Sequence, residues 1–183
     1  KAVSLKAIAQ QMVKKGKGIL AADESTGTCS KRLDSINVES TFENRNEYRD
    51  MLFTAKGIEE FISGVILYDE TIHQATTCDK KIPFIDLLNS KNILPGIKVD
   101  TGAMDMAGFQ GEKITEGLDG LRLRLENYYK IGARFAKWRA VITISDELPS
   151  DACIYSNAHG LARYAALCQE AGIVPIVEPE VLM

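Results

Sequence analysis

The sequence predicts an α/β fold built on a parallel β-sheet. Five short apolar segments recur roughly every forty residues, and each ends in one or two ionisable side chains. Helix-like sequence fills each gap, which is typical of alternating strands and helices. The predicted strands are residues 18–23, 62–69, 96–100, 135–139 and 174–180. Ligands of parallel sheets bind at the carboxyl ends of the strands, so the position of these charges indicates an enzyme.

The helix before the first strand is predicted from its apolar face. Apolar residues recur at helical spacing from Leu5 to Val13, and Gly16 is expected to end the helix in a left-handed conformation. A second helix, rich in polar residues, is expected over residues 43–53 between the first two strands. Its predicted inward residues are Tyr48, Met51 and Leu52.

Two further helices are predicted before the fourth and fifth strands. The first is predicted from apolar residues that recur at helical spacing, and it is expected to end at Gly132. These residues are Leu118, Leu121, Leu125, Tyr128 and Ile131. Residues 121–125 also alternate as a strand would, but the helical stripe is longer, so we predict a helix. Asn157 is the predicted N-cap of the second helix, which is expected to end at Gly172.

Composition limits the possible partners and the compartment. The 183 residues are 45% hydrophobic and 26% charged, as in a soluble domain, and we expect a single domain over residues 1–183. A net charge of −3 disfavours binding to nucleic acid or to an acidic membrane. There is no apolar run of membrane-spanning length and no signal-peptide layout. The four scattered cysteines indicate reduced thiols, so a cytoplasmic protein is expected.

The sequence gives little support for a metal or a cofactor. It has only two histidines, His73 and His159, and neither ends a predicted strand. A histidine-rich metal site is therefore not expected. The glycines at 16 and 18 precede a strand and lack a third glycine, so they do not form a dinucleotide-binding motif. We predict neither a metal nor a cofactor.

The charges at the strand ends are expected to face a single cavity. Side chains two residues apart point to the same face of a strand. Lys98 is therefore expected to share a face with Asp100. The same holds for Lys137 with Arg139, and for Glu178 with Glu180. A charge in a buried strand costs several kcal/mol unless partners or a ligand compensate it. Such a cluster suits a phosphorylated substrate that carries a carbonyl group. A purely structural network of ion pairs is the alternative.

Eight segments resemble the class I fructose-1,6-bisphosphate aldolases. They occur in the family's order over nearly the whole chain, and several are long and unusual. The segments are GKGILAADESTGTCSKR, ENR, SGVILYDET, LPGIKVD, GLDGL, ARFAKWRAV, NAHGLARYA and GIVPIVEPE. The resemblance implies a TIM (β/α)8 barrel, of which this chain covers about the first five βα units.

The resemblance also implies a reaction and roles for five residues. The family forms a Schiff base without metal and reversibly cleaves fructose 1,6-bisphosphate into dihydroxyacetone phosphate and glyceraldehyde 3-phosphate, in glycolysis and gluconeogenesis. Asp23 resembles the aspartate that orients a sugar hydroxyl. Lys98 and Lys137 resemble lysines that stabilise charge. Glu178 resembles the general acid/base, and Glu180 the carboxylate that sets the charge of the neighbouring lysines.

Further residues are implied to bind the sugar bisphosphate or to support its binding. A hydroxyl pair and arginine forks suit a phosphate group. These residues are Ser25, Thr28, Arg32, Arg45, Lys137 and Arg139. The resemblance further implies that the complete protein is a homotetramer.

The resemblance places the Schiff-base lysine on a sixth strand, beyond Met183, so this chain alone is expected to be inactive. Lys137 is the best internal substitute for this lysine. Its apolar neighbours would lower the pKa of the ammonium group and so favour the neutral amine, which is the nucleophile. Its position in the family argues against that role. Two other functions stay open: another Schiff-base sugar-phosphate lyase, such as a transaldolase, and a non-catalytic half-barrel that binds a phosphosugar or a protein.

Overall fold

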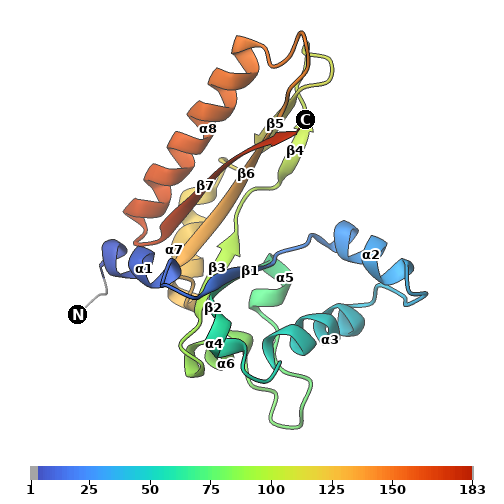
Figure 1. Ribbon diagram of the computed structural model, residues 1–183, viewed down its shortest axis with the longest axis vertical. Coiled ribbons are helices and arrows are strands. Elements are labelled where there is room, and N and C mark those ends of the chain that lie inside the picture. Colours follow the sequence, from blue (N-terminus) through green and yellow to red (C-terminus); the bar gives the residue numbers. More distant parts are fainter. Residues whose placement is uncertain (1–3, 183) are drawn as a thin grey trace.

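A parallel sheet of five strands forms the centre of the computed structural model, which describes residues 4–182 (Figure 1). The strands are β1 (Gly18–Ala22), β2 (Ile62–Leu67), β3 (Leu94–Lys98), β6 (Phe135–Thr143) and β7 (Val174–Leu182). They are ordered β1-β2-β3-β6-β7, and every pair is parallel. All five predicted strands are present, so the predicted α/β fold is confirmed. The sheet is open, because β1 and β7 each pair with one neighbour within the described residues.

Helices occupy the connections between the strands. Their bounds are α1 (Leu5–Met12), α2 (Thr26–Asp34), α3 (Phe42–Phe53), α4 (Ile58–Phe61), α5 (Asp69–Ile72), α6 (Phe84–Ser90), α7 (Leu121–Ile131) and α8 (Asp151–Glu170). The connection after β3 also contains an antiparallel hairpin of β4 (Gly102–Asp105) and β5 (Lys113–Glu116), which the sequence did not lead us to expect. Between residues 4 and 182, no helix is long and apolar enough to cross a membrane.

The two faces of the sheet pack against different cores. Val65 and Leu67 of β2 belong to a large core that the sheet shares with the helices. In that core Trp138 stacks on Tyr164, with ring centroids 5.5 Å apart. Ile66, between those two β2 residues, points the other way because side chains alternate along a strand. It joins a smaller core with α1, made of Ile8, Met12, Ile66, Leu94 and Phe135.

Phe135 requires glycine on both neighbouring strands. A Cβ atom added to Gly64 of β2 would lie 2.8 Å from the Phe135 ring, and one added to Gly96 of β3 would overlap the ring. The two glycines therefore leave space for the aromatic side chain, which is fully buried. This packing fixes the amino-terminal ends of three adjacent strands.

Two helix predictions need correction near the amino terminus. Helix α1 ends at Met12, and Val13 is 76% exposed at its C-cap, although Gly16 does adopt a positive φ of 80°. Met51 of α3 does not point inward, because it is 61% exposed. The buried residues of α3 are instead Arg49 and Phe53. The inward face of this polar helix is set by its tertiary partners rather than by an apolar stripe.

Helix α8 begins earlier than predicted. Ser150 is its N-cap and accepts a hydrogen bond from the Cys153 backbone N–H, so the predicted cap Asn157 lies inside the helix. Asn157 is buried and donates from Nδ2 to the Lys113 carbonyl at 2.9 Å, which ties α8 to β5. By contrast, the helix predicted from the 118–131 stripe is present as α7, with Gly132 as its C-cap, although it begins at Leu121 and Leu118 lies before it.

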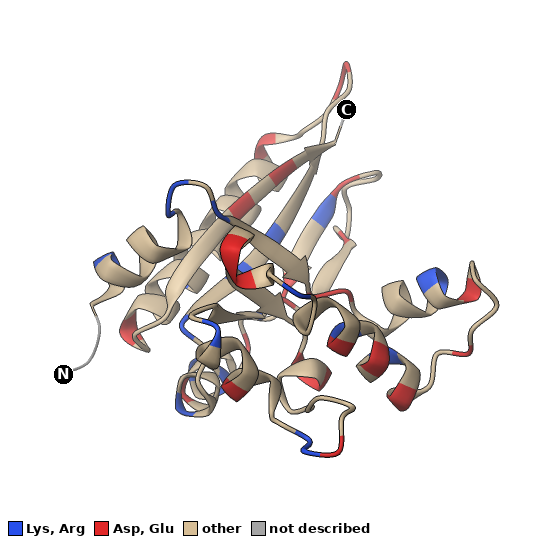
Figure 2. Ribbon diagram, turned by 60° about the horizontal axis from the view of Figure 1, so that its bottom comes forward, with Lys and Arg blue, Asp and Glu red and all other residues tan. Residues whose placement is uncertain are grey.

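Charged side chains of both signs are interspersed over the molecule. Figure 2 shows acidic and basic positions side by side on the long strands and on the helices. The mixture of both signs along the chain agrees with the small net charge of −3.

Candidate active site

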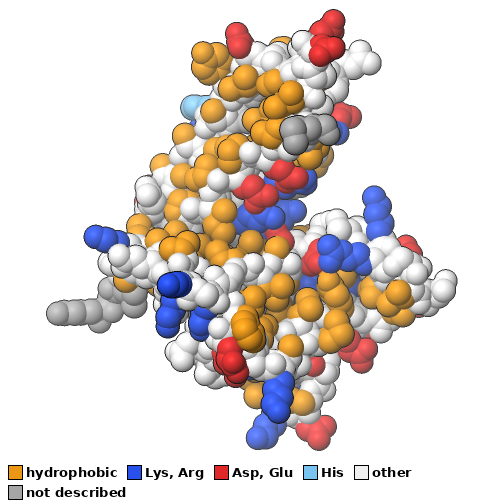
Figure 3. Space-filling model, viewed as in Figure 1, with side chains coloured by type: hydrophobic (Ala, Val, Ile, Leu, Met, Phe, Trp, Pro, Cys, Tyr) orange, Lys and Arg blue, Asp and Glu red, His pale blue; other side chains and the backbone are white. Residues whose placement is uncertain are grey.

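The carboxyl ends of the strands bring acidic and basic side chains together around Lys137. Its Nζ lies 3.1 Å from Asp23 Oδ2 and 3.6 Å from Glu178 Oε2. These residues come from the end of β1, from β6 and from β7, so the cluster spans the open sheet. Figure 3 shows acidic and basic side chains gathered in a hollow between the part of the molecule that contains α8 and the part that contains α2 and α3.

The environment of Lys137 favours its charged form. Burial alone would lower the pKa of the ammonium group, whose side chain is only 14% exposed. The carboxylates of Asp23, Glu178 and Asp100 outweigh burial and raise the pKa above its ordinary value. A protonated amine is not a nucleophile, so this environment does not fit Lys137 as a substitute Schiff-base lysine. The expectation that its apolar neighbours lower the pKa is therefore wrong.

Lys98 adds a second ammonium group to the same edge of the sheet. It is the register partner of Lys137 on the adjacent strand, so the two side chains share a face. Its Nζ lies 3.6 Å from Asp100 Oδ1. Asp100 is held by the backbone, because its carboxylate accepts hydrogen bonds from the Gly102 N–H at 3.1 Å and the Arg139 N–H at 3.2 Å. Asp100 thus fixes the position of the Lys98 charge relative to β6.

Arg139 and Glu180 form a separate ion pair farther along β6 and β7. The hydrogen bond from Arg139 lowers the pKa of the Glu180 carboxyl, and the same bond raises the pKa of the guanidinium. Both side chains are partly exposed. Lys98 thus lies next to the carboxylate that parity paired it with, whereas the carboxylates next to Lys137 and Arg139 come from other strands.

The loop after β1 is held by a buried arginine that the sequence analysis missed. Arg49 of α3 donates to the Ala22 carbonyl at 3.1 Å and to the Glu24 carbonyl at 2.8 Å, on either side of Asp23. Its Nη2 also lies 3.2 Å from Glu24 Oε2, and its Nη1 donates to Cys29 Sγ. Arg49 therefore fixes the backbone that carries Asp23. An arginine in a polar helix gives no sequence signal of such burial.

Three of the predicted phosphate-binding residues lie on one face of α2. Ser25 is the N-cap and accepts from the Thr28 N–H at 3.3 Å, and the two hydroxyl oxygens are 3.2 Å apart. Arg32, one turn further on, is exposed and pairs with Glu24 and with the Tyr48 hydroxyl. This face combines hydroxyl groups, a helix N-terminus and a guanidinium, all of which are favourable for an anion.

Arg45 is not part of that face. Its guanidinium forms a bidentate pair with Glu70, at 2.8 Å from Nε to Oε1 and 2.7 Å from Nη2 to Oε2. Its Nη1 also donates to the Ser40 carbonyl at 2.6 Å. Arg45 therefore joins α3 to α5, and its donors are used within the protein.

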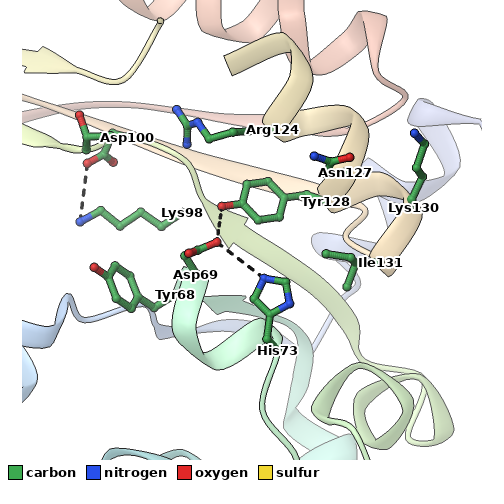
Figure 4. Close-up of a pocket in the computed structure, with 11 residues that line it drawn as sticks. Tyr68, Asp69, His73, Lys98, Asp100, Arg124, Asn127, Tyr128, Lys130 and Ile131 are labelled. Atoms are coloured by element: carbon green, nitrogen blue, oxygen red, sulfur yellow. Dashed lines mark hydrogen bonds and ion pairs between the residues drawn. The ribbon is translucent and has the colours of Figure 1, made fainter. Parts of the chain in front are cut away.

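A cavity of about 700 Å³ opens beside Lys98 and Asp100, between α5 and α7 (Figure 4). Inside it, Tyr128 of α7 donates its hydroxyl to Asp69 Oδ1 of α5 at 2.6 Å. Burial raises the pKa of Tyr128, and the hydrogen bond to Asp69 adds to this effect. The cavity does not include the cluster around Lys137. It shares only Lys98 and Asp100 with the strand-end charges, so we treat it as a neighbour of the candidate site.

The described residues contain no group of three or more His, Cys, Asp or Glu side chains arranged to hold a metal ion. The chemistry available at the strand ends is that of ammonium groups held next to carboxylates. Such pairs can stabilise developing negative charge and can transfer protons.

The family model for class I fructose-bisphosphate aldolase matches residues 4–183 of this chain. The chain is 59% identical over 175 residues to a probable class 1 fructose-bisphosphate aldolase of Xylella fastidiosa. This match covers 96% of the chain and 52% of the relative. It is 58% identical to the cytoplasmic isozyme 2 of fructose-bisphosphate aldolase from Pisum sativum, over 92% of the chain and 46% of the relative. The chain thus spans about half the length of the curated relatives it matches.

A solved structure agrees with the sequence relatives. Fructose-bisphosphate aldolase from Plasmodium falciparum, crystallised with TRAP and a small-molecule inhibitor, superposes with a TM-score of 0.93 at 53% identity. The superposition covers 97% of this chain and 51% of that one. The five-stranded sheet is therefore the fold of about half of an aldolase barrel, as the resemblance implied. The chain belongs to the class I fructose-bisphosphate aldolase family.

Proposed function

We propose that the complete protein containing this chain is a class I fructose-bisphosphate aldolase. In this proposal it cleaves fructose 1,6-bisphosphate reversibly, through a Schiff base and without metal. The observation that carries the proposal is the position of the Lys137 ammonium between Asp23 and Glu178, on strands far apart in sequence. Charged groups held in this way at strand ends suit proton transfer on a polar substrate.

Each charged residue has a proposed role. Glu178 is the general acid/base, supported by its position 3.6 Å from the Lys137 ammonium at the carboxyl ends of the strands. Asp23 orients the sugar hydroxyl at the bond to be broken. Lys98 and Lys137 stabilise negative charge that develops in the reaction. Glu180, paired with Arg139, balances the charge on β6.

The phosphate groups are proposed to bind near the β1–α2 loop and beside β6. Ser25, Thr28 and Arg32 present donors on one face of α2. Lys137 and Arg139 contribute cations from β6. Arg45 supports this region indirectly, because its guanidinium is already paired with Glu70.

The attacking amine is proposed to come from outside residues 1–183, since the pKa of Lys137 is raised rather than lowered. We also propose that the complete protein is cytosolic and tetrameric. The location is supported by relatives named as cytosolic or cytoplasmic isozymes in Arabidopsis thaliana and Pisum sativum. The tetramer is inferred from the family alone.

The test is a cleavage assay on the complete protein in the presence of EDTA. We expect cleavage of fructose 1,6-bisphosphate that EDTA does not inhibit, and inactivation by borohydride only when substrate is present. Replacing Glu178 by Gln should lower kcat by about 10²–10⁴-fold with a smaller change in substrate binding. The control is Glu170→Gln on the exposed face of α8, which should leave kcat unchanged.

Three outcomes would contradict the proposal in different ways. Loss of activity with EDTA would exclude the metal-free reaction. Binding of the bisphosphate without cleavage would favour a non-catalytic phosphosugar-binding protein. Trapping of a different sugar phosphate would favour another lyase that uses a Schiff base.

A further inference from the structure

A second cavity, of about 510 Å³, lies between α3 and the segment of residues 73–83. It contains none of the residues to which a catalytic role is proposed above. Residues of α3 form one wall and the segment after α5 forms the other. The residues that line it include Phe42, Glu43, Asn46, Glu47, Gln74 and Lys81.

Gln74 is the first unusual feature of this cavity. Only 5% of the residue is exposed, yet both polar atoms of its side-chain amide lack a hydrogen-bond partner among residues 4–182. Exchanging the amide oxygen and nitrogen would leave the same two groups open. The backbone holds the residue firmly, because its N–H donates to the Thr71 carbonyl and its carbonyl accepts from the Phe84 N–H, both at 3.0 Å. A buried amide without hydrogen-bond partners is unfavourable, so the protein retains Gln74 against a penalty.

Asn46 adds a second open acceptor in the same cavity. Its Nδ2 donates to the Ala75 carbonyl at 3.1 Å, which fixes the orientation of the amide and joins α3 to the facing segment. Its Oδ1 is buried and has no partner within the described part of the chain. The two amides therefore leave one donor and two acceptors without partners in the wall of the cavity, and a ligand in the cavity reaches them only when the side chains rotate toward it.

This combination selects among classes of ligand. A cation supplies only donors and would leave Gln74 Nε2 unpaired. An anion supplies only acceptors, and it would lie near the carboxylates of Glu43 and Glu47, opposed by the single ammonium of Lys81. A hydroxyl group both donates and accepts, so neighbouring hydroxyls can satisfy both amides.

The rim of the cavity favours the same class. Phe42 is 52% exposed at the start of α3 and lines the cavity, so its ring offers a flat apolar surface. Sugar rings present C–H groups on one face and hydroxyls at the edge, which fits an aromatic side chain next to amides and carboxylates. We propose that this cavity binds an uncharged, polyhydroxylated ligand of the sugar class, separately from the bisphosphate site.

The alternative is that ordered water satisfies the two amides, as water often does for buried polar groups. Saturation-transfer NMR on the complete protein distinguishes the two, with methyl α-D-glucopyranoside and maltose as probes. We expect transfer to both probes at millimolar concentration. D-glucose 6-phosphate should bind more weakly at this cavity, because its charge meets the two glutamates.

Variants locate the binding. Gln74→Met keeps the volume of the side chain but removes both polar atoms, and should weaken probe binding by about tenfold. Phe42→Ala should weaken it several-fold, while the matched control Met51→Ala, an exposed apolar residue of the same helix, should not. Cleavage of the bisphosphate should stay unchanged in all three. Because Phe42 is exposed, its variant tests the proposal even if Gln74→Met does not fold.

Three results would overturn the proposal. One is the absence of transfer to either sugar at millimolar concentration, which would leave water as the partner of the amides. Another is wild-type binding in both the Gln74→Met and Phe42→Ala variants, which would place the sugar elsewhere. The third is tighter binding of arginine amide than of the glucoside at this cavity, which would show a cation site instead.

Discussion

The two sides of the sheet differ in how completely their strands are enclosed. On β2, residues 63–67 are all buried, whereas none of the described residues of β7 is buried. The β2 strand has neighbours on both edges, helices over one face and the α1 core on the other. The β7 strand pairs with β6 alone, and Val177 is 50% exposed.

This difference divides the candidate site into an enclosed part and an exposed part. Lys98 and Lys137 extend from strands with neighbours on both edges. Glu178 and Glu180 extend from β7, the least enclosed strand. The ammonium groups are therefore positioned by the core, while Glu178, proposed for proton transfer, and Glu180 depend on the pairing of β7 with β6. This comparison leads to predictions that differ between the two sides.

The largest effect is expected at Arg49, on the enclosed side. Arg49→Met removes a buried cation, leaves the Ala22 and Glu24 carbonyls without their donor and takes away one of the two guanidinium groups next to the Glu24 carboxylate. Loss of one partner of a buried pair typically costs about 3–5 kcal/mol, so the free energy of unfolding should fall by that amount in urea titrations. Arg122→Met, which breaks the exposed pair with Glu170, is the control and should cost less than about 1 kcal/mol.

A direct comparison of the two strands comes next. Leu67→Ala on β2 should destabilise the protein by about 2–5 kcal/mol, because it opens a cavity in a fully buried position. Val177→Ala on β7 should cost less than about 1 kcal/mol, because the side chain is half exposed. Urea unfolding of both variants measures the difference. An equal loss of unfolding free energy in the two variants would contradict the difference between the strands and show that β7 is covered in solution.

The ion pairs of Lys137 and of Glu180 should lose their contribution to stability at opposite ends of the pH range. The pKa of Lys137 is raised from its ordinary 10.5, so its contribution is complete below pH 10.5 and is lost as the pH rises through the raised value. Its charge-assisted bond to Asp23 is worth about 1.5–3 kcal/mol. As the pH is raised from 7, the gap in unfolding free energy between the wild type and Lys137→Met should therefore narrow only at strongly alkaline pH. A gap that narrows between pH 7 and pH 10 would contradict the raised pKa.

The smallest effect is expected for the exposed pair. Arg139 lowers the pKa of Glu180 from its ordinary 4.5, so the pair contributes stability above that pH and loses it as the pH falls through the lowered value. Because both side chains are partly exposed, the contribution should not exceed about 1 kcal/mol. Glu180→Gln should thus differ from the wild type slightly at pH 7 and not at all in strong acid. A large difference in unfolding free energy between Glu180→Gln and the wild type at pH 7 would contradict this, and would show that β7 is as well enclosed as β2.

The strands and their charges could be predicted because both signals are local. An apolar run that ends in a charge marks a strand and its carboxyl end, and alternation along the strand assigns the face. These rules correctly paired Lys98 with Asp100. They did not give the partners of Lys137 and Arg139, whose carboxylates lie on other strands. The choice of helix over strand for residues 121–125 was also correct, because the helical stripe extended beyond the alternation.

The errors have a common physical cause, which is contact with distant parts of the chain. Asn157 has the chemistry of an N-cap, but it pairs with Lys113, and Ser150 caps the helix instead. Arg49 is buried because carbonyls of the β1–α2 loop accept its donors. The raised pKa of Lys137 comes from carboxylates on other strands, which its apolar sequence neighbours do not reveal.

Phe135 and its two glycines also constrain how this sequence can evolve. A methyl group at Gly64 or Gly96 cannot be added while the ring is present, whereas a smaller residue at Phe135 opens space for either change. The order of substitutions is therefore fixed: the aromatic position must change first, at the cost of a cavity. A lineage that keeps the phenylalanine is committed to glycine on both neighbouring strands.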